Sequence, residues 1–487
     1  MSTLASYLLG NPVVQWTITI SLMLFAMGLG SRLSKLAERA LLDFFITIEL
    51  ALSLLCAMSA TLIYFLTAFV QSIDFFIYLI SIMIGLLIGL EVPLVTRLNS
   101  YFEELRVNIS SVMEKDYYGA LLGGLLFAFV ALPYLGLTYT PIALGAVNLA
   151  VAAVLFFQHR QQLHYRRSLS AGFAILPVLL ISLAVFAKPI VLFGEQQNYR
   201  DKVIYEQQTP YQKIVLTKWK NDFWLYLNNS QQFSTYDEEK YHEPLVLPAM
   251  LASAARKNIL ILGGGDGLAV RETLKFNEVE SITLVDIDPA VTKLGKSNPL
   301  FLKANEGVLE DSRVEIVNQD AFTFLANERR IFDVVIIDLP DPKSLGLSRL
   351  YSKQFYETIK KRLSPGGVVV TQATSPFFAQ KAFLCILKTM GAAGLNAQAF
   401  HNHIPTMGEW GWVIGMNAGS FSTVDLKSRL LKLDFSGLET RFLNHEAMRG
   451  MLSFGKGMME QIPDIEVNDE FNLTLFQYYT SGAWDYY

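Results

Sequence analysis

Two aspartates, Asp338 and Asp341, are the residues whose types and spacing best suggest chemistry, and they follow an apolar run at 334–337. Two carboxylates in one site would attract a cationic substrate, such as an alkyl diamine. A carboxylate beside a substrate ammonium can also accept its proton and leave a nucleophilic amine. Taken alone, however, paired carboxylates after a strand more often cap a helix or form a surface turn. The two residues therefore need support from the rest of the sequence.

Further acidic residues at the ends of predicted strands provide that support. Residues 263–267 read Gly-Gly-Gly-Asp-Gly after an apolar run, and glycines there permit a tight turn and the close approach of a ligand. Asp286 ends the next run, about 20 residues later, where an acid suits the hydroxyls of a ribose. Asp320 follows the third run. A glycine loop alone is weak support, but together these placements predict an adenosine-containing ligand, as in dinucleotide or S-adenosylmethionine enzymes.

Parallel strands alternating with helices must position these acids. The apolar runs lie at 259–262, 282–285, 314–317, 334–337 and 368–370. Runs that are apolar throughout suit strands buried on both faces of a parallel sheet. Residues 237–487 are therefore predicted to form an α/β doubly wound, Rossmann-like domain with a C-terminal extension. Short β-rich runs within 196–236 predict a small antiparallel β domain ahead of it.

The first 195 residues differ in composition from the remainder. The chain is 52% hydrophobic and only 17% charged, whereas soluble domains carry about 25% charged residues. A bilayer-spanning helix needs about 20 apolar residues. Six segments qualify, at 12–30, 44–69, 75–96, 117–136, 140–157 and 169–192. Residues 1–195 are therefore predicted to form an α-helical transmembrane bundle that contacts the lipid bilayer.

Charge and the metal-ligating residue types restrict the partners. The net charge of −4, without a basic block, argues against a nucleic-acid partner. Cys56 and Cys385 lie in apolar runs of different halves, which predicts neither a disulfide nor a thiolate metal site. His401 and His403 have no further His or Cys at ligand spacing, so we expect a loop near the substrate rather than a metal site.

Several motifs of this chain resemble those of spermidine synthases in order and spacing. These motifs are Tyr211-Gln212, Tyr241-His242-Glu243, the glycine run at 263–267, Asp338-Leu339-Pro340-Asp341-Pro342, Phe355-Tyr356-Glu357 and Gln372. Residues 26–31, 116–120 and 476–479 resemble the membrane-bound branch of the polyamine aminopropyltransferases. The resemblance covers nearly the whole chain and implies a methyltransferase-type Rossmann-like domain.

The family transfers the aminopropyl group of decarboxylated S-adenosylmethionine to putrescine, giving spermidine and 5′-methylthioadenosine without a metal or cofactor. The resemblance implies that Asp338 accepts the proton of the attacking amine. It implies that the polyamine is bound by Tyr241, His242, Asp266 and Asp341. It implies that the donor is bound by Gln212, Gln232, Asp266, Asp286, Asp320 and Ala321. Asp286 and Ala321 stand where soluble relatives usually carry Glu and Gly, which leaves donor affinity and the choice of amine open.

Two other functions remain open. The same fold could serve an S-adenosylmethionine-dependent methyltransferase, although a methyl acceptor rarely needs so negative a site. The second alternative is a non-catalytic polyamine transporter or sensor. Glu91 lies within a predicted span close to Pro93, and an acidic residue at membrane depth suggests a functional site. A carboxylate paired with Arg97 at the interface is the more ordinary interpretation of Glu91. Soluble relatives are oligomers, so a homo-oligomer is a further expectation.

The connections between predicted spans carry an orientation signal. Basic residues gather after the first, third and fifth spans, at Arg32, Lys35, Arg39, Arg97, Arg106, Lys115, Arg160, Arg166 and Arg167. The positive-inside rule places these connections in the cytoplasm, and six spans then leave both the N-terminus and the C-terminal domain outside. Membrane-bound relatives usually carry one more helix ahead of the segment resembling residues 3–10. We therefore expect a truncated or misassigned start, an inner-membrane location and a cytoplasmic catalytic domain.

Overall fold

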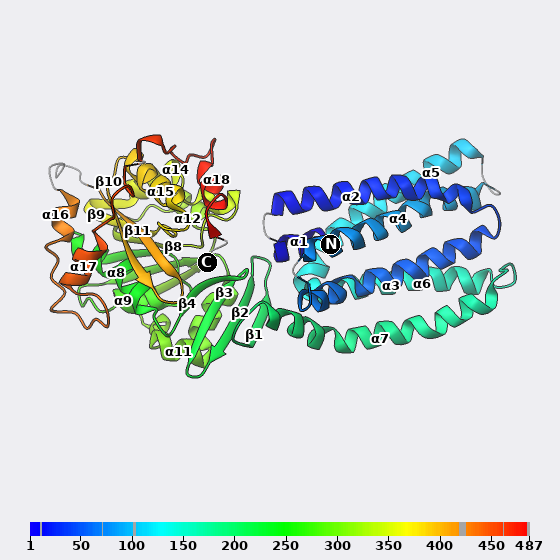
Figure 1. Cartoon of the computed structure of the whole chain (residues 1–487), viewed down its shortest axis with the longest axis horizontal. Helices are drawn as coiled ribbons and strands as arrows, with labels where there is room; N and C mark the ends of the chain where they lie inside the picture. Colours follow the sequence, from blue (N-terminus) through cyan, green and yellow to red (C-terminus); the bar gives the residue numbers. More distant parts are fainter. Residues whose placement is uncertain (10–11, 71, 101–103, 418–424, 461, 485–487) are drawn as a thin grey trace. The chain divides into compact units, whose positions relative to one another are not determined.

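The computed structural model describes residues 1–9, 12–70, 72–100, 104–417, 425–460 and 462–484. It divides into two compact units, Met1–Ile204 and Tyr205–Tyr487 (Figure 1).

The first unit is a bundle of helices. They are α1 (Ser2–Leu9), α2 (Pro12–Leu33), η1 (Ser34–Leu36), α3 (Leu41–Thr67), α4 (Ile73–Asn99), α5 (Leu105–Leu126), the π-helical η2 (Phe127–Leu135), α6 (Gly136–Gln158) and α7 (Arg166–Gln197). Five helical stretches are long and apolar enough to cross a membrane, at 13–36, 41–67, 73–99, 105–158 and 166–197.

The fourth of these stretches has 54 residues and contains two helical segments rather than one. Gly136 interrupts it with φ 64° and ψ −170°, a conformation essentially restricted to glycine. On either side of this break, α5 packs against α4 and α6 packs against α3 and α7. The predicted segments 117–136 and 140–157 therefore belong to separate antiparallel helices in the structure (Figure 1).

A small antiparallel sheet follows the bundle. Its strands are β1 (Lys202–Gln208), β2 (Lys213–Trp219), β3 (Asp222–Leu227) and β4 (Ser230–Ser234), in that spatial order. The apolar pattern does not predict β4, but the dipeptide Asn228-Asn229 signals it. Both residues have positive φ, 49° and 63°, as a two-residue hairpin turn requires.

The second sheet has seven strands in the order β10-β11-β9-β8-β5-β6-β7. The strands are β5 (Asn258–Gly263), β6 (Ser281–Asp286), β7 (Val314–Asn318), β8 (Phe332–Asp338), β9 (Leu363–Gln372), β10 (Asn396–Ile404) and β11 (Gly408–Met416). The helices around them are α8 (Glu239–Ala252), α9 (Leu268–Thr273), α10 (Pro289–Ser297), α11 (Pro299–Asn305), η3 (Val308–Glu310), α12 (Ala321–Asn327), α13 (Leu345–Arg349), α14 (Lys353–Arg362), α15 (Gln380–Ala392), α16 (Leu426–Leu430), α17 (His445–Met451), η4 (Ile462–Asp464) and α18 (Thr474–Thr480).

The five predicted apolar strands are confirmed as β5 to β9, which pair in parallel. Their side chains form hydrophobic clusters that include Ile261 on one side and Leu262 on the other, both fully buried. This two-sided burial explains why the runs lack alternation. After β5 the chain places β6 and β7 on one side and β8 on the other. The switch point of this Rossmann-like sheet therefore lies between β5 and β8, where ligands bind in open α/β sheets.

The hairpin of β10 and β11 was not predicted, and it corrects the interpretation of two histidines. His401 and His403 lie on β10 rather than in a loop. His401 Nδ1 lies 3.0 Å from Glu409 Oε2 on the neighbouring strand. The mixed aromatic and polar composition of 396–404 hid this strand, because it lacks the continuous apolar run of the central strands.

Candidate active site

Asp338 lies at the switch point of the large sheet. It is the last residue of β8 and pairs with Gly263, the last residue of β5. Gly263 has φ 82°, and a Cβ there would collide with the Asp338 carbonyl oxygen. Glycine is therefore required at this position if the glycine loop is to pass the strand end that carries Asp338.

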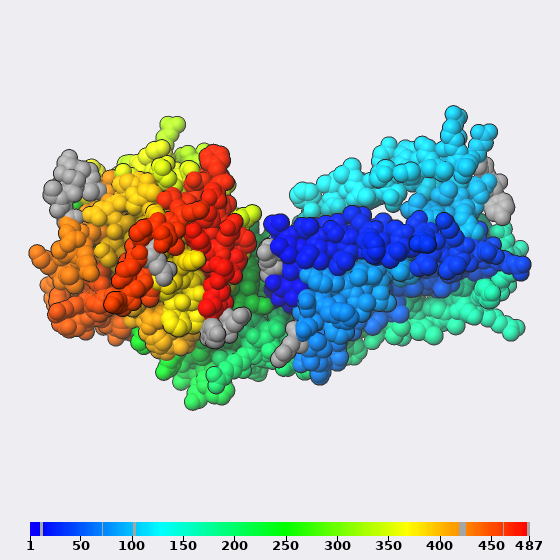
Figure 2. Space-filling model, turned by 45° about the horizontal axis from the view of Figure 1, so that its top comes forward, coloured from blue at the N-terminus to red at the C-terminus, as the bar shows by residue number. Residues whose placement is uncertain are grey.

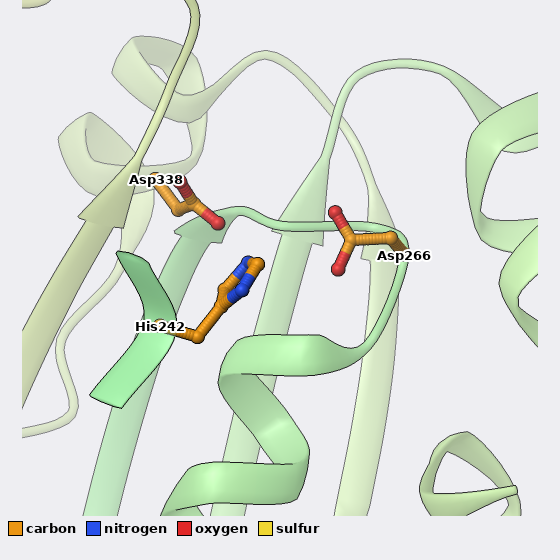
Figure 3. A group of neighbouring side chains, drawn as sticks. All are labelled: His242, Asp266 and Asp338. Carbon is orange, nitrogen blue, oxygen red and sulfur yellow. The ribbon is translucent and has the colours of Figure 1, made fainter. Parts of the chain in front are cut away.

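Side chains from two further elements, α8 and the glycine loop, meet beside Asp338. His242 projects from α8 between the carboxylates of Asp338 and Asp266, which lies in the glycine loop (Figure 3). One ligand-type atom from each of the three residues lies within 4.8 Å of the others. Tyr241, the preceding residue of α8, donates its hydroxyl to Asp338 Oδ1 at 2.7 Å. The structure thus brings together Tyr241, His242, Asp266 and Asp338, as the sequence predicted.

The Asp266, His242 and Asp338 group also has the composition of a metal site, because imidazole and carboxylate groups are common ligands. His242 Nδ1, however, already contacts Glu238 Oε2 at 3.1 Å, which leaves only Nε2 for the two aspartates. The prediction of a metal-free site stays a prediction.

Electrostatics in this cluster favour protonation of its acids. The pKa of Asp338 is raised to about 6, first by loss of water and then by the Asp266 carboxylate, while the charge of His242 and the hydrogen bond from Tyr241 oppose both effects. Burial likewise raises the pKa of Asp266. Burial alone would lower the pKa of His242, but its hydrogen bond to Glu238 and the nearby carboxylates raise it overall. The carboxyl groups and the imidazole of this cluster therefore influence one another's protonation.

Glu238 contacts the Nδ1 atom of His242, the ring nitrogen that is not left for the two aspartates, and it was not identified from the sequence. Its side chain is 3% exposed, and Oε2 also accepts a hydrogen bond from Arg271 Nη2 at 2.9 Å. Arg441 contacts the other carboxylate oxygen. The run Asp-Glu-Glu-Lys at 237–240 is typical of an exposed turn, which concealed the role of Glu238. The i,i+4 spacing of Glu238 and His242 was the one available signal.

Asp341 lies in the loop after β8 and has its own set of hydrogen-bond donors. Gln372 Nε2 donates to Asp341 Oδ1 at 3.3 Å, and the Tyr479 hydroxyl donates to Oδ2 at 2.9 Å. Gln372 also donates to the Tyr351 hydroxyl at 2.7 Å. Burial raises the pKa of Asp341, while the charge of Lys343 and both donors oppose that rise. The sequence did not assign Tyr351 or Tyr479 to the site.

Asp286 and Gln212 both form a hydrogen bond with Asp288, which lies just after β6. Asp286, the last residue of β6, accepts hydrogen bonds from the backbone N–H groups of Gly265, at 3.1 Å, and Asp288, at 2.9 Å. Burial raises its pKa to about 6 despite these donors. Gln212 donates to Asp288 Oδ2 at 3.0 Å. Asp288 therefore links two of the predicted donor-binding residues at the end of β6.

The remaining predicted donor residues make local contacts. Asp320 caps α12, since its Oδ1 accepts a hydrogen bond from Thr323 N at 2.8 Å. Ala321 is the first residue of that helix and is buried. Gln232 donates to the Ser230 carbonyl within β4. Among the residues that the structure describes, no hydrogen bond joins Asp320 or Gln232 to the acidic cluster, and their donor roles stay predictions.

A seven-stranded Rossmann-like sheet with buried acids at its switch point defines the second unit as a Rossmann-like enzyme domain. Residues 238–428 match the family model described as the spermine/spermidine synthase domain. The chain is 38% identical to a polyamine aminopropyltransferase of Oceanobacillus iheyensis, over 99% of this chain and 94% of that protein. It is 41% identical to polyamine aminopropyltransferase 2 of Aquifex aeolicus, over 98% and 94%.

This chain therefore belongs to the polyamine aminopropyltransferase family, which confirms the resemblance identified in the sequence. A crystal structure of spermidine synthase from Thermotoga maritima shares 23% identity with a TM-score of 0.47, covering 54% of this chain and 88% of that one.

Proposed function

We propose that the second unit transfers the aminopropyl group of decarboxylated S-adenosylmethionine to putrescine, yielding spermidine and 5′-methylthioadenosine. The proposal rests on family membership together with one observation, the meeting of Asp338, Asp266 and His242 at the switch point. Both reactants are cations, and a site rich in carboxylates offsets their mutual repulsion.

The reaction requires one proton acceptor and an aligned nucleophile. Asp338 removes a proton from the attacking ammonium, so that the nitrogen lone pair becomes available. That nitrogen forms a bond to the aminopropyl carbon attached to sulfur, while the carbon–sulfur bond breaks and its electron pair stays on sulfur. The sulfonium becomes a neutral thioether. Tyr241 fixes the acceptor oxygen of Asp338, and alignment of the two cations supplies much of the remaining rate enhancement.

Product analysis tests the proposal directly. The purified full chain would be incubated with decarboxylated S-adenosylmethionine and, separately, with putrescine, cadaverine or spermidine, and products would be identified by mass spectrometry. We expect equal amounts of 5′-methylthioadenosine and an aminopropylated amine, with putrescine as the preferred acceptor. Absence of transfer to every amine would refute the proposal. Methyl transfer from S-adenosylmethionine to any of the amines would favour a methyltransferase instead.

Asp286 provides a prediction for donor binding. If its carboxylate accepts hydrogen bonds from the ribose hydroxyls, Asp286→Asn should raise the KM of the donor about tenfold, because charged hydrogen bonds are lost. With a pKa of about 6, protonation should also raise the wild-type donor KM as pH falls below 6. The variant should lack this pH dependence. Steady-state kinetics at saturating amine measures both effects.

The matched control for that experiment is Asp311→Asn, because Asp311 pairs with Arg313 before β7. This control should leave the donor KM unchanged. A variant of Asp286 with wild-type donor KM at every pH would show that the ribose is bound elsewhere.

We also propose that the helical unit spans a cell membrane, and that this membrane is the inner membrane of a bacterium. Support comes from its apolar helices and from large side chains such as Phe25 and Ile181, which are each 65% exposed. Apolar side chains exposed all along a bundle suit lipid rather than water. Carbonate-washed membranes should retain the full chain, whereas recovery in the wash would contradict the proposal.

The orientation of the bundle involves two opposing arguments. The basic connections after α2, α4 and α6 lie at one end of the bundle, and α7 ends at the other, where the catalytic unit follows (Figure 1). A helix ahead of α2 would not change this relation, because both features lie downstream of it. The charge rule therefore places the catalytic unit outside. We propose the cytoplasmic side nevertheless, because a doubly charged donor made there crosses a bilayer only at high cost.

A reporter fused after Tyr487 decides the orientation. Alkaline phosphatase is active only outside the cytoplasm. Green fluorescent protein fluoresces in the cytoplasm but not after export by the general secretory route. We expect fluorescence without phosphatase activity. The opposite pattern would place the catalytic unit outside and would support the charge rule.

A further inference from the structure

The C-terminal helix α18 contributes a side chain to the amine-holding part of the site. Tyr479 on this helix donates its hydroxyl to Asp341 Oδ2 at 2.9 Å, although 138 residues separate the two. Tyr479 lies outside residues 238–428, which match the spermine/spermidine synthase domain. This chain therefore completes the surroundings of Asp341 with a residue from beyond that domain.

The helix is held firmly enough to position this hydroxyl. α18 packs against α15, and Leu475 is fully buried in the hydrophobic cluster on that face of the sheet. Beyond the helix, Trp484 Nε1 donates to the Tyr479 carbonyl at 2.7 Å, and the two rings lie 4.7 Å apart. Trp484 also stacks on Phe378. Figure 2 shows the C-terminal segment, in red, on the surface of the second unit beside yellow segments that precede it in the chain.

The chemistry of this contact suits an ammonium ligand. A carboxylate can accept about four hydrogen bonds, and Tyr479 and Gln372 occupy one oxygen each. Capacity for an ammonium therefore remains. Both donors are neutral, so they stabilise the ionised form of Asp341 without adding a positive charge that would repel the amine. They also restrain the rotation of the carboxylate.

The positive charge nearest this contact belongs to Lys343. Its ammonium lies 6.0 Å from the centre of the Tyr479 ring and contacts Ser230 Oγ. The charge of Lys343 acts on Asp341, but among the described residues the two form no ion pair within 4.0 Å. The aromatic ring and the serine hydroxyl thus hold the lysine, and Tyr479 rather than Lys343 is the direct partner of the carboxylate.

We propose that Tyr479 is a specificity-determining residue, which fixes Asp341 at the position that binds the distal ammonium of an α,ω-diamine. The inference rests on the proposed aminopropyl transfer and deepens it. If Asp338 deprotonates one end of the acceptor while Asp341 holds the other, the position of Asp341 selects the length of the carbon chain. Loss of the Tyr479 hydroxyl should weaken binding of the preferred diamine and reduce discrimination by length.

Tyr479→Phe tests this role because it keeps the ring that packs against Trp484. KM and kcat would be measured at saturating donor for 1,3-diaminopropane, putrescine, cadaverine and spermidine. We expect the KM of the preferred diamine to rise about tenfold, kcat to change less than twofold, and the KM ratios among the diamines to move toward one. The donor KM should stay unchanged.

Tyr478→Phe is the matched control, because the Tyr478 hydroxyl accepts a hydrogen bond from Glu466 N at 3.3 Å and not from the site. It should reproduce wild-type kinetics. If Tyr479→Phe has wild-type KM values and length preference, the inference is wrong and aminopropyl transfer still stands. An equal rise of donor and amine KM in Tyr479→Phe would also contradict it, because that pattern indicates general disruption.

Calorimetric binding of the same amines separates the inference from the proposed function. If the wild type binds a diamine but transfers nothing, the proposed function fails. Weaker diamine binding by Tyr479→Phe would then support the amine site, and equal binding would refute it.

Discussion

Asp338→Asn is expected to lower kcat by about 10²- to 10⁴-fold, the usual contribution of a positioned general base. The asparagine oxygen can still accept the hydroxyl of Tyr241, so the geometry of the site should survive. What disappears is the group that removes a proton from the attacking ammonium. Binding of 5′-methylthioadenosine should remain within about twofold of wild type, because the nucleoside does not need that proton acceptor.

The pH profile supplies an independent readout for Asp338. The carboxyl must be ionised to accept a proton, and its pKa is about 6. Wild-type kcat/KM should therefore fall about tenfold per pH unit below pH 6. We call this decline the acid limb of the pH profile, and the residual activity of the variant should lack it. Asp425→Asn, which alters an exposed helix cap of α16, should retain both the rate and the limb. A variant with more than a tenth of wild-type kcat would exclude Asp338 as the base.

Asp338 also illustrates how the site trades stability for function. Its pKa is raised in the folded state above the usual value, so its contribution to stability is favourable at low pH and is lost as pH rises through about 6. At pH 7.5 the ionised side chain therefore opposes folding. The melting temperature of Asp338→Asn should equal or exceed that of the wild type, which distinguishes lost chemistry from lost structure.

Glu238→Gln should have the second large effect, on both stability and the pH profile. Arg271 is 7% exposed and would lose its 2.9 Å partner, while Glu272 at 2.8 Å remains. Breaking a buried ion pair costs about 3–5 kcal/mol, and the remaining partner places the loss near about 3 kcal/mol. Urea unfolding of the full chain in detergent, followed by fluorescence, measures this change.

The same substitution should move the acid limb of the activity profile. Glu238 raises the pKa of His242, and the charge of His242 in turn lowers the pKa of Asp338. Without the Glu238 carboxylate, His242 would become neutral at lower pH and the pKa of Asp338 would rise. The limb in kcat/KM should therefore shift above pH 6.

Glu239→Gln is the matched control for Glu238. This neighbouring glutamate contacts Lys240 and Arg441 but not His242. Its replacement should leave the limb in place. An unshifted limb in Glu238→Gln would show that Glu238 stabilises the fold without acting through His242.

The reaction centre could be inferred from the sequence because its information is local. Asp338 and Asp286 each end an apolar run, and parallel strands present their carboxyl ends at one edge of the sheet. Tyr241 and His242 are adjacent and were found through the family resemblance. The five central strands were equally visible, since burial on both faces requires continuous apolar runs.

Other elements escaped prediction because their pattern is not local. The hairpin of β10 and β11 mixes aromatic, polar and glycine residues, and its order in the sheet depends on pairing between β11 and β9. Asp320 was predicted to bind the donor, and in the structure its Oδ1 caps α12. The cap could not be told from the sequence, and the donor role stays a prediction.

The sequence by itself determined the five central strands and the family, and it predicted Asp338 as the base, because each depends on residue types within a short window. The tertiary structure alone decided which distant side chains complete the site. Glu238 meets Arg271 and Arg441 across 33 and 203 residues, and Asp341 meets Tyr479 across 138. Such contacts stabilise a buried charge only after the chain has folded, so no spacing rule in the sequence records them.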